Sequence, residues 1–320
     1  MKRIIAIVCA VLLLLSMTAC QKTQGDKKQY TIGICQIQPH AALDAATKGF
    51  KDAVIKGLGE ENVKFLNKNA AGEFANCGTI MDGFVAENVD LILANATGPL
   101  QAAASATGDI PVLGTSITDY ATALKISNWN GTVGGNISGT TDLAPLDDQA
   151  QMILDLFPDA KKVGLLYCSA EPNSVYQITQ VETYLTGKGI TCERFAFNDA
   201  NDLNAVTETA CANSDVVYIP TDNTAATYAE SIGNIAIAAK RPIICGESNT
   251  CAGCGVATLS IDYYDLGYAT GEMAVKILKG EADISKMPIQ SAAKFTKMYN
   301  KTICEELGIE IPEGYVAIEE

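Results

Sequence analysis

The stretch VGLLYCSAEPNSVYQI, residues 163–178, decides the fold class because its pattern changes halfway. Residues 163–168 form a continuous apolar run, which is typical of a buried strand. From residue 174 onward the spacing is helical, and Ile178, Val181 and Leu185 share one face. Four polar residues stand between the strand and the helix, namely Ser169, Glu171, Asn173 and Ser174. A helix start needs only one capping oxygen, so the remaining polar groups are candidates for binding a ligand.

The same succession of strand and amphipathic helix runs through the whole chain. The strands expected from apolar, β-branched runs are 31–35, 63–67, 89–94, 110–114, 163–168, 192–197, 215–219, 242–245, 257–261 and 293–299. One of the helices expected between them is 41–58, in which Leu43, Phe50 and Val54 share a face. Strict alternation of this kind predicts an α/β fold whose parallel sheets are covered by helices on both faces.

The alternation covers four units, is interrupted at NGTVGGNISGTTDLAP (130–145), and then covers four more. This interruption is poor in apolar residues and is interpreted as a crossover between two lobes. Two further candidate crossovers are GESNTCAGCG (246–255) and KGEADISKMP (279–288). Two sheets connected three times form a clamshell. Since ligands of open α/β sheets bind beyond the carboxyl ends of the strands, we expect a site between the lobes.

Polar residues collect after the strands in both halves of the chain. The candidate ligand-binding residues are Gln38, His40, Asn95, Thr97, Thr115, Ser116, Ser169, Glu171, Asn173, Ser174, Asp222, Asn223 and Glu247. Each of them alone has an ordinary structural interpretation. Asn173 or Ser174 is suited to cap one helix, and Asp222 or Asn223 the next. His40, the single histidine, is suited to a cap or supporting position as well as to ligand contact.

The chemistry of these residues favours a zwitterionic ligand. Helix N-termini attract a carboxylate, while Glu171, Asp222 and Glu247 offer negative charge to an ammonium group. Opposite charges 4 Å apart attract by roughly 4 kcal/mol at an effective dielectric constant of about 20. Burying an aromatic side chain adds roughly 4–6 kcal/mol. An amino acid with a large apolar side chain therefore fits better than a sugar, whose sites are usually rich in aromatic platforms. The only tryptophan is Trp129.

The N-terminus resembles a lipoprotein signal. Lys2 and Arg3 precede a short apolar run and then SMTAC, which predicts a signal peptide over residues 1–19 and lipidation at Cys20. Residues 20–29 are interpreted as the lipidated cysteine and a flexible tether. Without Lys2 and Arg3, 21 of the 23 basic residues remain against 37 acidic ones. This acidity argues against nucleic acid or an anionic membrane surface as a partner.

The cysteines leave several interpretations open. Of the 11, nine lie beyond Cys9 and Cys20, and most of these occupy apolar, strand-like runs, where a small hydrophobic role is favoured. CAGC (251–254) has the spacing of a redox or zinc motif. With one such motif and one histidine, a loop disulfide or idle thiols are favoured over redox or metal chemistry. We expect no cofactor and no metal.

Four segments resemble the substrate-binding lipoproteins of ABC importers for aromatic amino acids such as tryptophan, phenylalanine and tyrosine. They are NISGTTDLAPLDDQ (136–149), LLYCSAEPNSVYQI (165–178), VYIPTDN (217–223) and IDYYDLGYATGEMAVKILKG (261–280). The resemblance implies a type I periplasmic-binding fold with two Rossmann-like lobes and three crossovers. One lobe would comprise residues 30–142 plus 256–283, and the other 143–255 plus 284–320.

For function, the resemblance implies capture of an aromatic L-amino acid in the cleft and its delivery to a membrane permease. Asp222 would be the favoured partner of the ligand ammonium group, and the loops of Gln38, Asn95 and Thr115 would face it from the first lobe. The protein would be held on the outer face of the cytoplasmic membrane by its lipid.

Rival functions are a cleft enzyme, an adhesin or sensor, and a sugar or nucleoside carrier on the same fold. Glu171 and Asp222 could serve an enzyme as acid and base. However, the chain has no Gly-x-Ser-x-Gly elbow, no phosphate-binding GxxxxGK[ST] and no second histidine. We therefore expect a binding protein rather than an enzyme.

Overall fold

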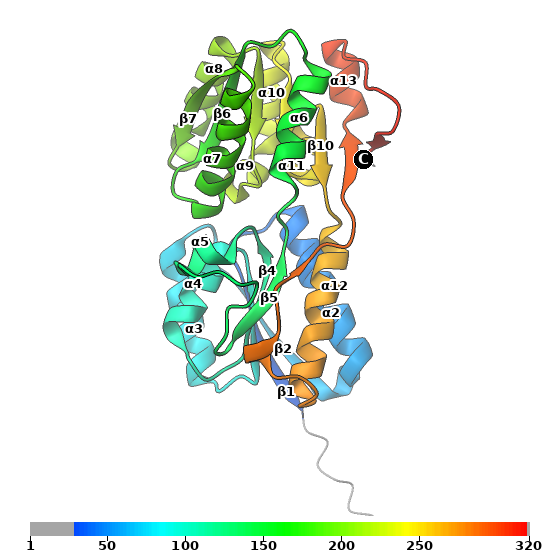
Figure 1. Ribbon diagram of the computed structural model, residues 1–320. Helices are drawn as coiled ribbons and strands as arrows, with labels where there is room; N and C mark the ends of the chain where they lie inside the picture. Colours follow the sequence, from blue (N-terminus) through cyan, green and yellow to red (C-terminus); the bar gives the residue numbers. More distant parts are fainter. Residues whose placement is uncertain (1–28, 319–320) are drawn as a thin grey trace, which may run out of the picture.

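The computed structural model describes residues 29–318. It has two stacked lobes, each with a central sheet and helices on both faces (Figure 1). The predicted signal peptide, Cys20 and the tether up to residue 28 lie outside the described residues. Within residues 29–318, no helix is long and apolar enough to span a membrane.

The sheet of the first lobe has six strands in the order β11-β5-β4-β3-β1-β2. Their neighbours pair in parallel throughout. The strands are β1 (Tyr30–Gln36), β2 (Val63–Asn69), β3 (Leu91–Asn95), β4 (Val112–Ile117), β5 (Ile137–Thr141) and β11 (Gln290–Ser291). The helices are α2 (Ala41–Leu58), α3 (Phe74–Ala86), α4 (Thr97–Ala106), α5 (Tyr120–Leu124) and α12 (Tyr263–Leu278), with the 3-10 turns η1 (Glu60–Asn62) and η2 (Ile284–Lys286).

Alternating side chains of the strands bury both faces of this sheet. In β3, Ile92 and Ala94 pack in a core with α3 and α4, whereas Leu91 and Leu93 pack in a core with α2 and α12. Successive strand residues point to opposite faces, so an uninterrupted apolar run is what a sheet covered twice requires.

Close packing of α12 against α2 fixes α12 in the first lobe, although it follows the second lobe's strands in sequence (Figure 1). A Cβ atom on Gly49 would lie 2.0 Å from the Tyr264 carbonyl oxygen, and one on Gly267 would lie 1.9 Å from that of Ala46. Both contacts are far shorter than van der Waals distance, so these two helices can approach this closely only with glycine at both positions.

The sheet of the second lobe has seven strands in the order β13-β12-β10-β9-β8-β6-β7, with β10 and β12 antiparallel. They are β6 (Lys162–Cys168), β7 (Thr191–Phe197), β8 (Val216–Ile219), β9 (Ile243–Cys245), β10 (Ala257–Ser260), β12 (Thr296–Tyr299) and β13 (Val316–Ala317). The helices are α6 (Leu146–Leu156), α7 (Pro172–Gly187), α8 (Ala200–Asn213), α9 (Asn223–Thr227), α10 (Ala229–Ala238), α11 (Ser248–Cys254) and α13 (Lys301–Leu307).

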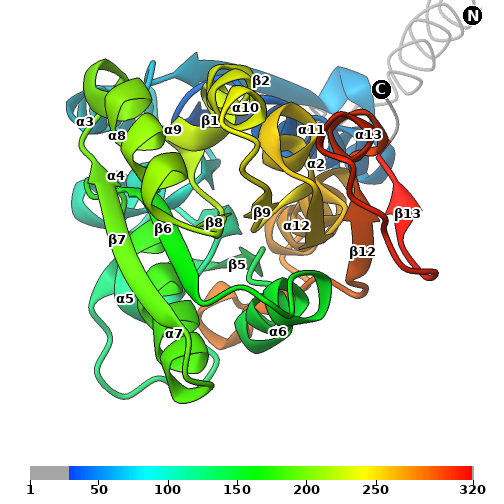
Figure 2. The ribbon, with the colours of Figure 1, turned by 90° about the horizontal axis from the view of Figure 1, so that it is seen from above.

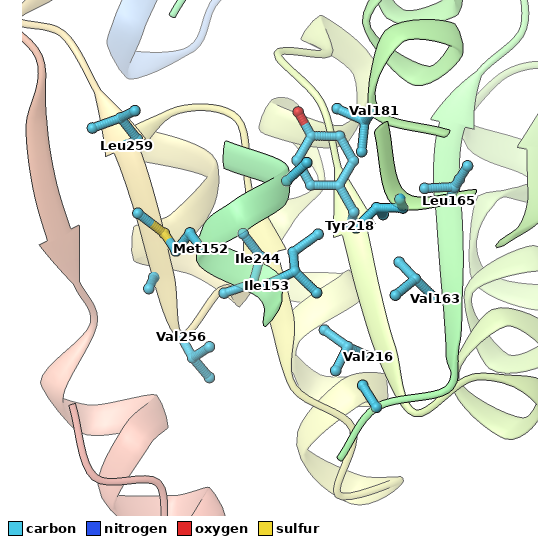
Figure 3. Close-up of a cluster of buried hydrophobic side chains, with 14 of the residues drawn as sticks. Met152, Ile153, Val163, Leu165, Val181, Val216, Tyr218, Ile244, Val256 and Leu259 are labelled. Atoms are coloured by element: carbon cyan, nitrogen blue, oxygen red, sulfur yellow. The ribbon is translucent and has the colours of Figure 1, made fainter. Parts of the chain in front are cut away.

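In this lobe, α6 and α7 cover one face of the sheet, and α8, α10 and α11 cover the other (Figure 2). Figure 3 shows the first of these cores, where Met152 and Ile153 of α6 lie among strand residues such as Val216. The Tyr218 hydroxyl in this core is satisfied, because it donates to Gln149 Oε1 at 2.6 Å. The Gln149 amide in turn donates to the carbonyl oxygen of Gly246, so the core supports the loop that starts α11.

Three segments connect the lobes, namely 142–145, 261–262 and 292–295. The first falls within the crossover expected at 130–145. The other two correct the predicted boundaries, because β10 belongs to the second sheet and β11 to the first. Residues 256–260 therefore lie in the second lobe, and residues 284–291 in the first. The segments 246–255 and 279–288 resemble crossovers in composition, but the first contains α11 of the second lobe and the second contains the turn η2 of the first lobe.

Strand β5 was not predicted, since its sequence ISGTT was interpreted as part of the polar crossover. Its polar side chains are all hydrogen-bonded: Ser138 donates to the Met287 carbonyl at 3.0 Å, and Thr141 donates to the Thr118 carbonyl at 2.8 Å. Thr140 Oγ1 donates to Thr115 Oγ1 at 3.3 Å and lies 2.8 Å from Thr270 Oγ1. Threonine favours strands by its branched shape, and hydrogen bonds replace the apolar contacts that the sequence pattern leads one to expect.

Candidate functional site

The carboxyl ends of the strands in both sheets meet between the lobes, and two connected spaces lie there. The outer cleft has a volume of about 460 Å³ and is lined by Gln38, Phe74 and Gly98 of the first lobe and by Glu171, Asn173 and Tyr228 of the second. The inner space is about 10 Å³ and is lined by His40, Ser116, Asp142, Asn173, Asp222 and Tyr263, among others. Asn173 and Asn223 line both spaces.

The lobes also touch across the site through direct polar contacts. His40 Nε2 lies 3.3 Å from Asn223 Oδ1. Gln177 of α7 donates to Thr118 Oγ1 of the first lobe at 3.5 Å. The loops of the two halves therefore converge, as expected from the strand-end clusters.

Asp222 is a helix cap as well as a lining residue of the cleft. Its Oδ1 accepts from the backbone N–H of Ala225 at 2.8 Å, and its Oδ2 from that of Cys168 at 2.7 Å. It is 1% exposed. Burial, and after it the neighbouring charge of Glu171, raises the pKa of Asp222 above its usual value. The capping role considered for Asp222 is thereby confirmed.

Glu171 bridges the loop after β6 to the start of α9. Its carboxylate accepts from the backbone N–H and the side chain of both Asn223 and Thr224, at 2.6–3.0 Å. These donors compensate a carboxylate that is only 5% exposed. Because they fix the rotamer of Glu171, they hold the wall of the outer cleft in place.

Glu247 caps the last of the cleft-facing helices. It accepts from the backbone N–H of Asn249 at 2.6 Å and from the backbone and hydroxyl of Thr250 at the start of α11. It is 3% exposed and lines the inner space. All three acidic residues predicted for the second lobe therefore neutralise a helix start and border the cleft at once.

The first lobe faces the cleft differently. The helices α2 and α4 begin after His40 and Ala96, and neither of these residues makes a side-chain cap hydrogen bond. The first turn of α4 contains no acidic residue. Ala96 and Ser116 have φ angles of 94° and 56°. Such strained conformations in residues other than glycine cost about 1–3 kcal/mol and are common at ligand sites.

Several buried polar atoms at the cleft have no hydrogen-bond partner. Within the part of the chain that the structure describes, Gln38 Nε2, His40 Nδ1, Ser116 Oγ and Asn173 Oδ1 are buried, unpaired and border one of the two spaces. Leaving such a group unsatisfied costs about 1–3 kcal/mol. The cleft therefore presents donors and acceptors from both lobes to whatever occupies it.

Five of the predicted site residues do not border either space. Thr97 and Thr115 are buried in the first lobe, and Thr115 pairs with Thr140 across the sheet. The Asn95 amide donates to the Leu43 carbonyl at 2.8 Å, behind the start of α2. Ser174 is fully buried. The exposed Ser169 donates to the Phe197 carbonyl at 3.1 Å, on the far side of its loop.

Sequence reasoning missed other residues of the cleft, notably Asp142, Thr118 and Tyr263 of the inner space. Asp142 and Tyr263 lie at the first and second connections between the lobes. Both fall in quoted motifs, but a residue in a connecting segment can be placed at the site only once the lobe boundaries are known. Phe74 and Tyr228 stand on opposite lobes at the outer cleft and are 40% and 41% exposed.

The cysteines are thiols rather than disulfides. All nine cysteines of the described residues are free, and eight of them are buried. Cys251 and Cys254 are therefore not joined, and Cys254 Sγ donates to the Thr250 carbonyl at 3.2 Å. The small hydrophobic role favoured for cysteines in apolar, strand-like runs agrees with the burial of Cys35, Cys168 and Cys245.

Comparison with known proteins assigns the family. The model of the ABC transporter substrate binding protein family matches residues 31–318. A tyrosine-binding protein of Clostridioides difficile (strain R20291) is 31% identical over 323 residues, which cover 97% of this chain and 93% of the relative. The chain belongs to the family of ABC transporter substrate-binding proteins, whose members are extracytoplasmic.

Two solved structures are informative together. The ABC domain in complex with L-Trp from Streptococcus pneumoniae is 32% identical, with a TM-score of 0.85, over 91% of this chain and 100% of that one. The ligand-free, open structure of a substrate binding protein with adhesive properties from Clostridium difficile is 33% identical, with a TM-score of 0.69, over 91% and 99%. At nearly equal identity, this chain therefore superposes better on the L-Trp complex than on the ligand-free, open structure.

Proposed function

We propose that this protein captures an aromatic L-amino acid between its lobes and delivers it to an ABC permease in the membrane. The observation that carries the proposal is the set of unpaired polar atoms, from both lobes, around a cleft bordered by buried carboxylates. The family and the relatives that bind tyrosine and L-Trp support the same conclusion.

The charge distribution supports one orientation of the ligand. Glu171 and Glu247 place carboxylates on the second-lobe side of the cleft, which favours the ammonium group near that side. The starts of α2 and α4 lack capping side chains, and Gln38 Nε2 is an unpaired donor on the same side of the cleft. These groups suit the α-carboxylate.

The outer cleft suits the aromatic side chain. Its volume of about 460 Å³ exceeds what one aromatic ring needs, and Phe74 and Tyr228 offer ring faces from opposite lobes. Aromatic pairs contribute about 0.5–1.5 kcal/mol beyond the burial of their area. Closure of the lobes over the ligand would exclude water from the charged groups and strengthen their attraction.

Delivery requires the protein to stay near its permease. The predicted signal peptide and the lipidation of Cys20 supply an anchor on the outer face of the cytoplasmic membrane. Domain closure would then create the surface that the permease recognises, and the partner ATPase would supply the energy for transport. The protein itself would catalyse no reaction.

Titration calorimetry tests the proposal. L-tyrosine, L-tryptophan and L-phenylalanine are titrated beside a panel of sugars and nucleosides, and each mixture is assayed for product. We expect one aromatic amino acid per chain, with a micromolar or tighter dissociation constant corresponding to at least about 8 kcal/mol. Binding of a sugar or nucleoside alone, or turnover of the ligand, would contradict the proposed function.

A further inference from the structure

Within the described residues, four buried carboxylates border the cleft, and they differ in how their charge is compensated. Glu171, Asp222 and Glu247 each accept backbone N–H groups at the start of a helix. Asp142 lies at the first connection between the lobes, is 5% exposed, and caps no helix. Of the four, it is therefore the one carboxylate that no helix start compensates.

The partners of Asp142 are two neutral hydroxyl groups. Thr118 Oγ1 donates to its Oδ1 at 3.2 Å, and the Tyr263 hydroxyl donates to its Oδ2 at 3.0 Å. Tyr263 begins α12, directly after the second connection between the lobes. Across residues 29–318, the linings of both spaces contain no lysine or arginine that could neutralise Asp142.

The inner space beside Asp142 has the size of one small polar group. Its volume of about 10 Å³ is close to the ~10–15 Å³ that a single water needs by this measure. Ser116 Oγ and Asn173 Oδ1 border it without a partner, and both residues are 7% exposed. An ammonium group has three N–H donors, and these two oxygens together with Asp142 provide three acceptors.

We propose that Asp142 is the residue that neutralises the ammonium group of the ligand, with Thr118 and Tyr263 positioning its carboxylate. Asp222, the partner favoured from the sequence, already has one backbone N–H donor on each oxygen. The inference rests on the proposed function. Burial raises the pKa of Asp142 to about 6, as expected for a carboxylate without a charged partner.

This placement connects recognition to closure. The ligand's positive charge would lie between two of the three connecting segments, where the lobes rotate relative to each other. Thr118 also accepts from Gln177 of the second lobe at 3.5 Å. A ligand held at Asp142 thus lies next to an interlobe contact that forms only when the lobes approach.

A pair of ligands tests the assignment. Asp142→Asn keeps the size of the side chain and removes its charge. The wild type and this variant are titrated with two matched pairs of ligands: L-tryptophan with 3-indolepropionate, and L-tyrosine with 3-(4-hydroxyphenyl)propionate. Each propionate lacks only the ammonium group. We expect Asp142→Asn to weaken amino-acid binding at least thirtyfold and to change propionate binding less than threefold. Equal losses for both ligands, or an amino-acid loss under threefold, would overturn the assignment.

Two further measurements apply if the variant does not fold or if the propionates bind too weakly. If Asp142→Asn does not fold, Tyr263→Phe is tested in its place. We expect this variant to weaken binding of the amino acid three- to tenfold and to leave binding of the propionate unchanged. An equal loss of affinity for the propionate overturns the assignment. If the propionates bind too weakly to measure, amino-acid affinity is measured as a function of pH. We expect the affinity of the wild type to fall below pH 6 and that of Asp142→Asn to stay constant. Parallel pH profiles for the two proteins overturn the assignment. Failure of the wild type to bind any aromatic amino acid overturns the proposed function as well.

Discussion

In the second lobe the short helices that face the cleft begin with carboxylates, whereas in the first lobe α2 and α4 begin with His40 and Ala96, which provide no capping hydrogen bond. Both lobes have the same strand–helix alternation and both direct their helix starts toward the cleft. They differ in these capping positions: carboxylates accept the first N–H groups of α9 and α11, whereas the starts of α2 and α4 have no side-chain acceptor. Two halves with similar folds can thus bind the two opposite charges of one zwitterion.

The largest effect expected on the second-lobe side of this comparison comes from Asp222→Ala. It removes the cap of α9 and the acceptor of the Cys168 N–H, so the free energy of unfolding falls by about 2–4 kcal/mol. Binding weakens by more than tenfold, because α9 and Glu171 form one wall of the cleft. Urea unfolding and titration calorimetry measure the two effects.

Asn300→Ala is the matched control, since Asn300 caps α13 of the same lobe away from the two spaces. It should lower stability and leave the dissociation constant unchanged. A near-normal affinity in Asp222→Ala would remove this carboxylate from the site and leave it a cap only.

Acidity should weaken binding through Asp142. Its pKa of about 6 means that acidification from pH 7 to pH 5 protonates most of this carboxylate, and the ligand ammonium favours the ionised form. Affinity should therefore fall about tenfold over this range. The charged or titratable groups around Asp142 are Tyr120, Tyr263, Glu247, His40 and Asp222.

Titrations of wild type and Asp142→Asn at each pH separate the contribution of Asp142 from that of the other titratable groups around it. An affinity for the wild type that is constant between pH 7 and pH 5, or that rises, would contradict this part of the account.

A smaller effect is expected from the aromatic residues, one on each lobe. Phe74→Ala and Tyr228→Ala should each weaken binding by roughly three- to tenfold, corresponding to about 0.5–1.5 kcal/mol for one aromatic contact. Both side chains are substantially exposed, so the melting temperature should change little. Loss of binding in only one of the variants would assign the ring contact to a single lobe.

Much of the fold could be predicted from sequence because apolar runs report directly on strands that are buried on both faces. The pattern failed at β5, whose buried Thr140 pairs with Thr115 and Thr270, and at β11 and β13, which have two residues each. The lobe boundaries after residue 255 also differed, since a polar loop that crosses between lobes has the same composition as one that starts a helix.

The lining of the cleft was predictable where a whole loop faces it, as for Glu171, Asn173 and Asp222. The lining could not be predicted at Thr115 and Asn95. At the end of a strand, the residue whose side chain points into the lobe and the residue whose side chain faces the cleft are neighbours in sequence. Asp142 and Tyr263 could not be found either, because their position depends on how two distant connections between the lobes lie side by side.

The crystal structure of the protein with bound L-tyrosine or L-tryptophan tests the central claim most directly. We expect the ammonium nitrogen within hydrogen-bonding distance of Asp142 and next to the second-lobe carboxylates, the α-carboxylate at the starts of α2 and α4, and the ring between Phe74 and Tyr228. A ligand in the reverse orientation, or one bound outside the space between the lobes, would contradict the account.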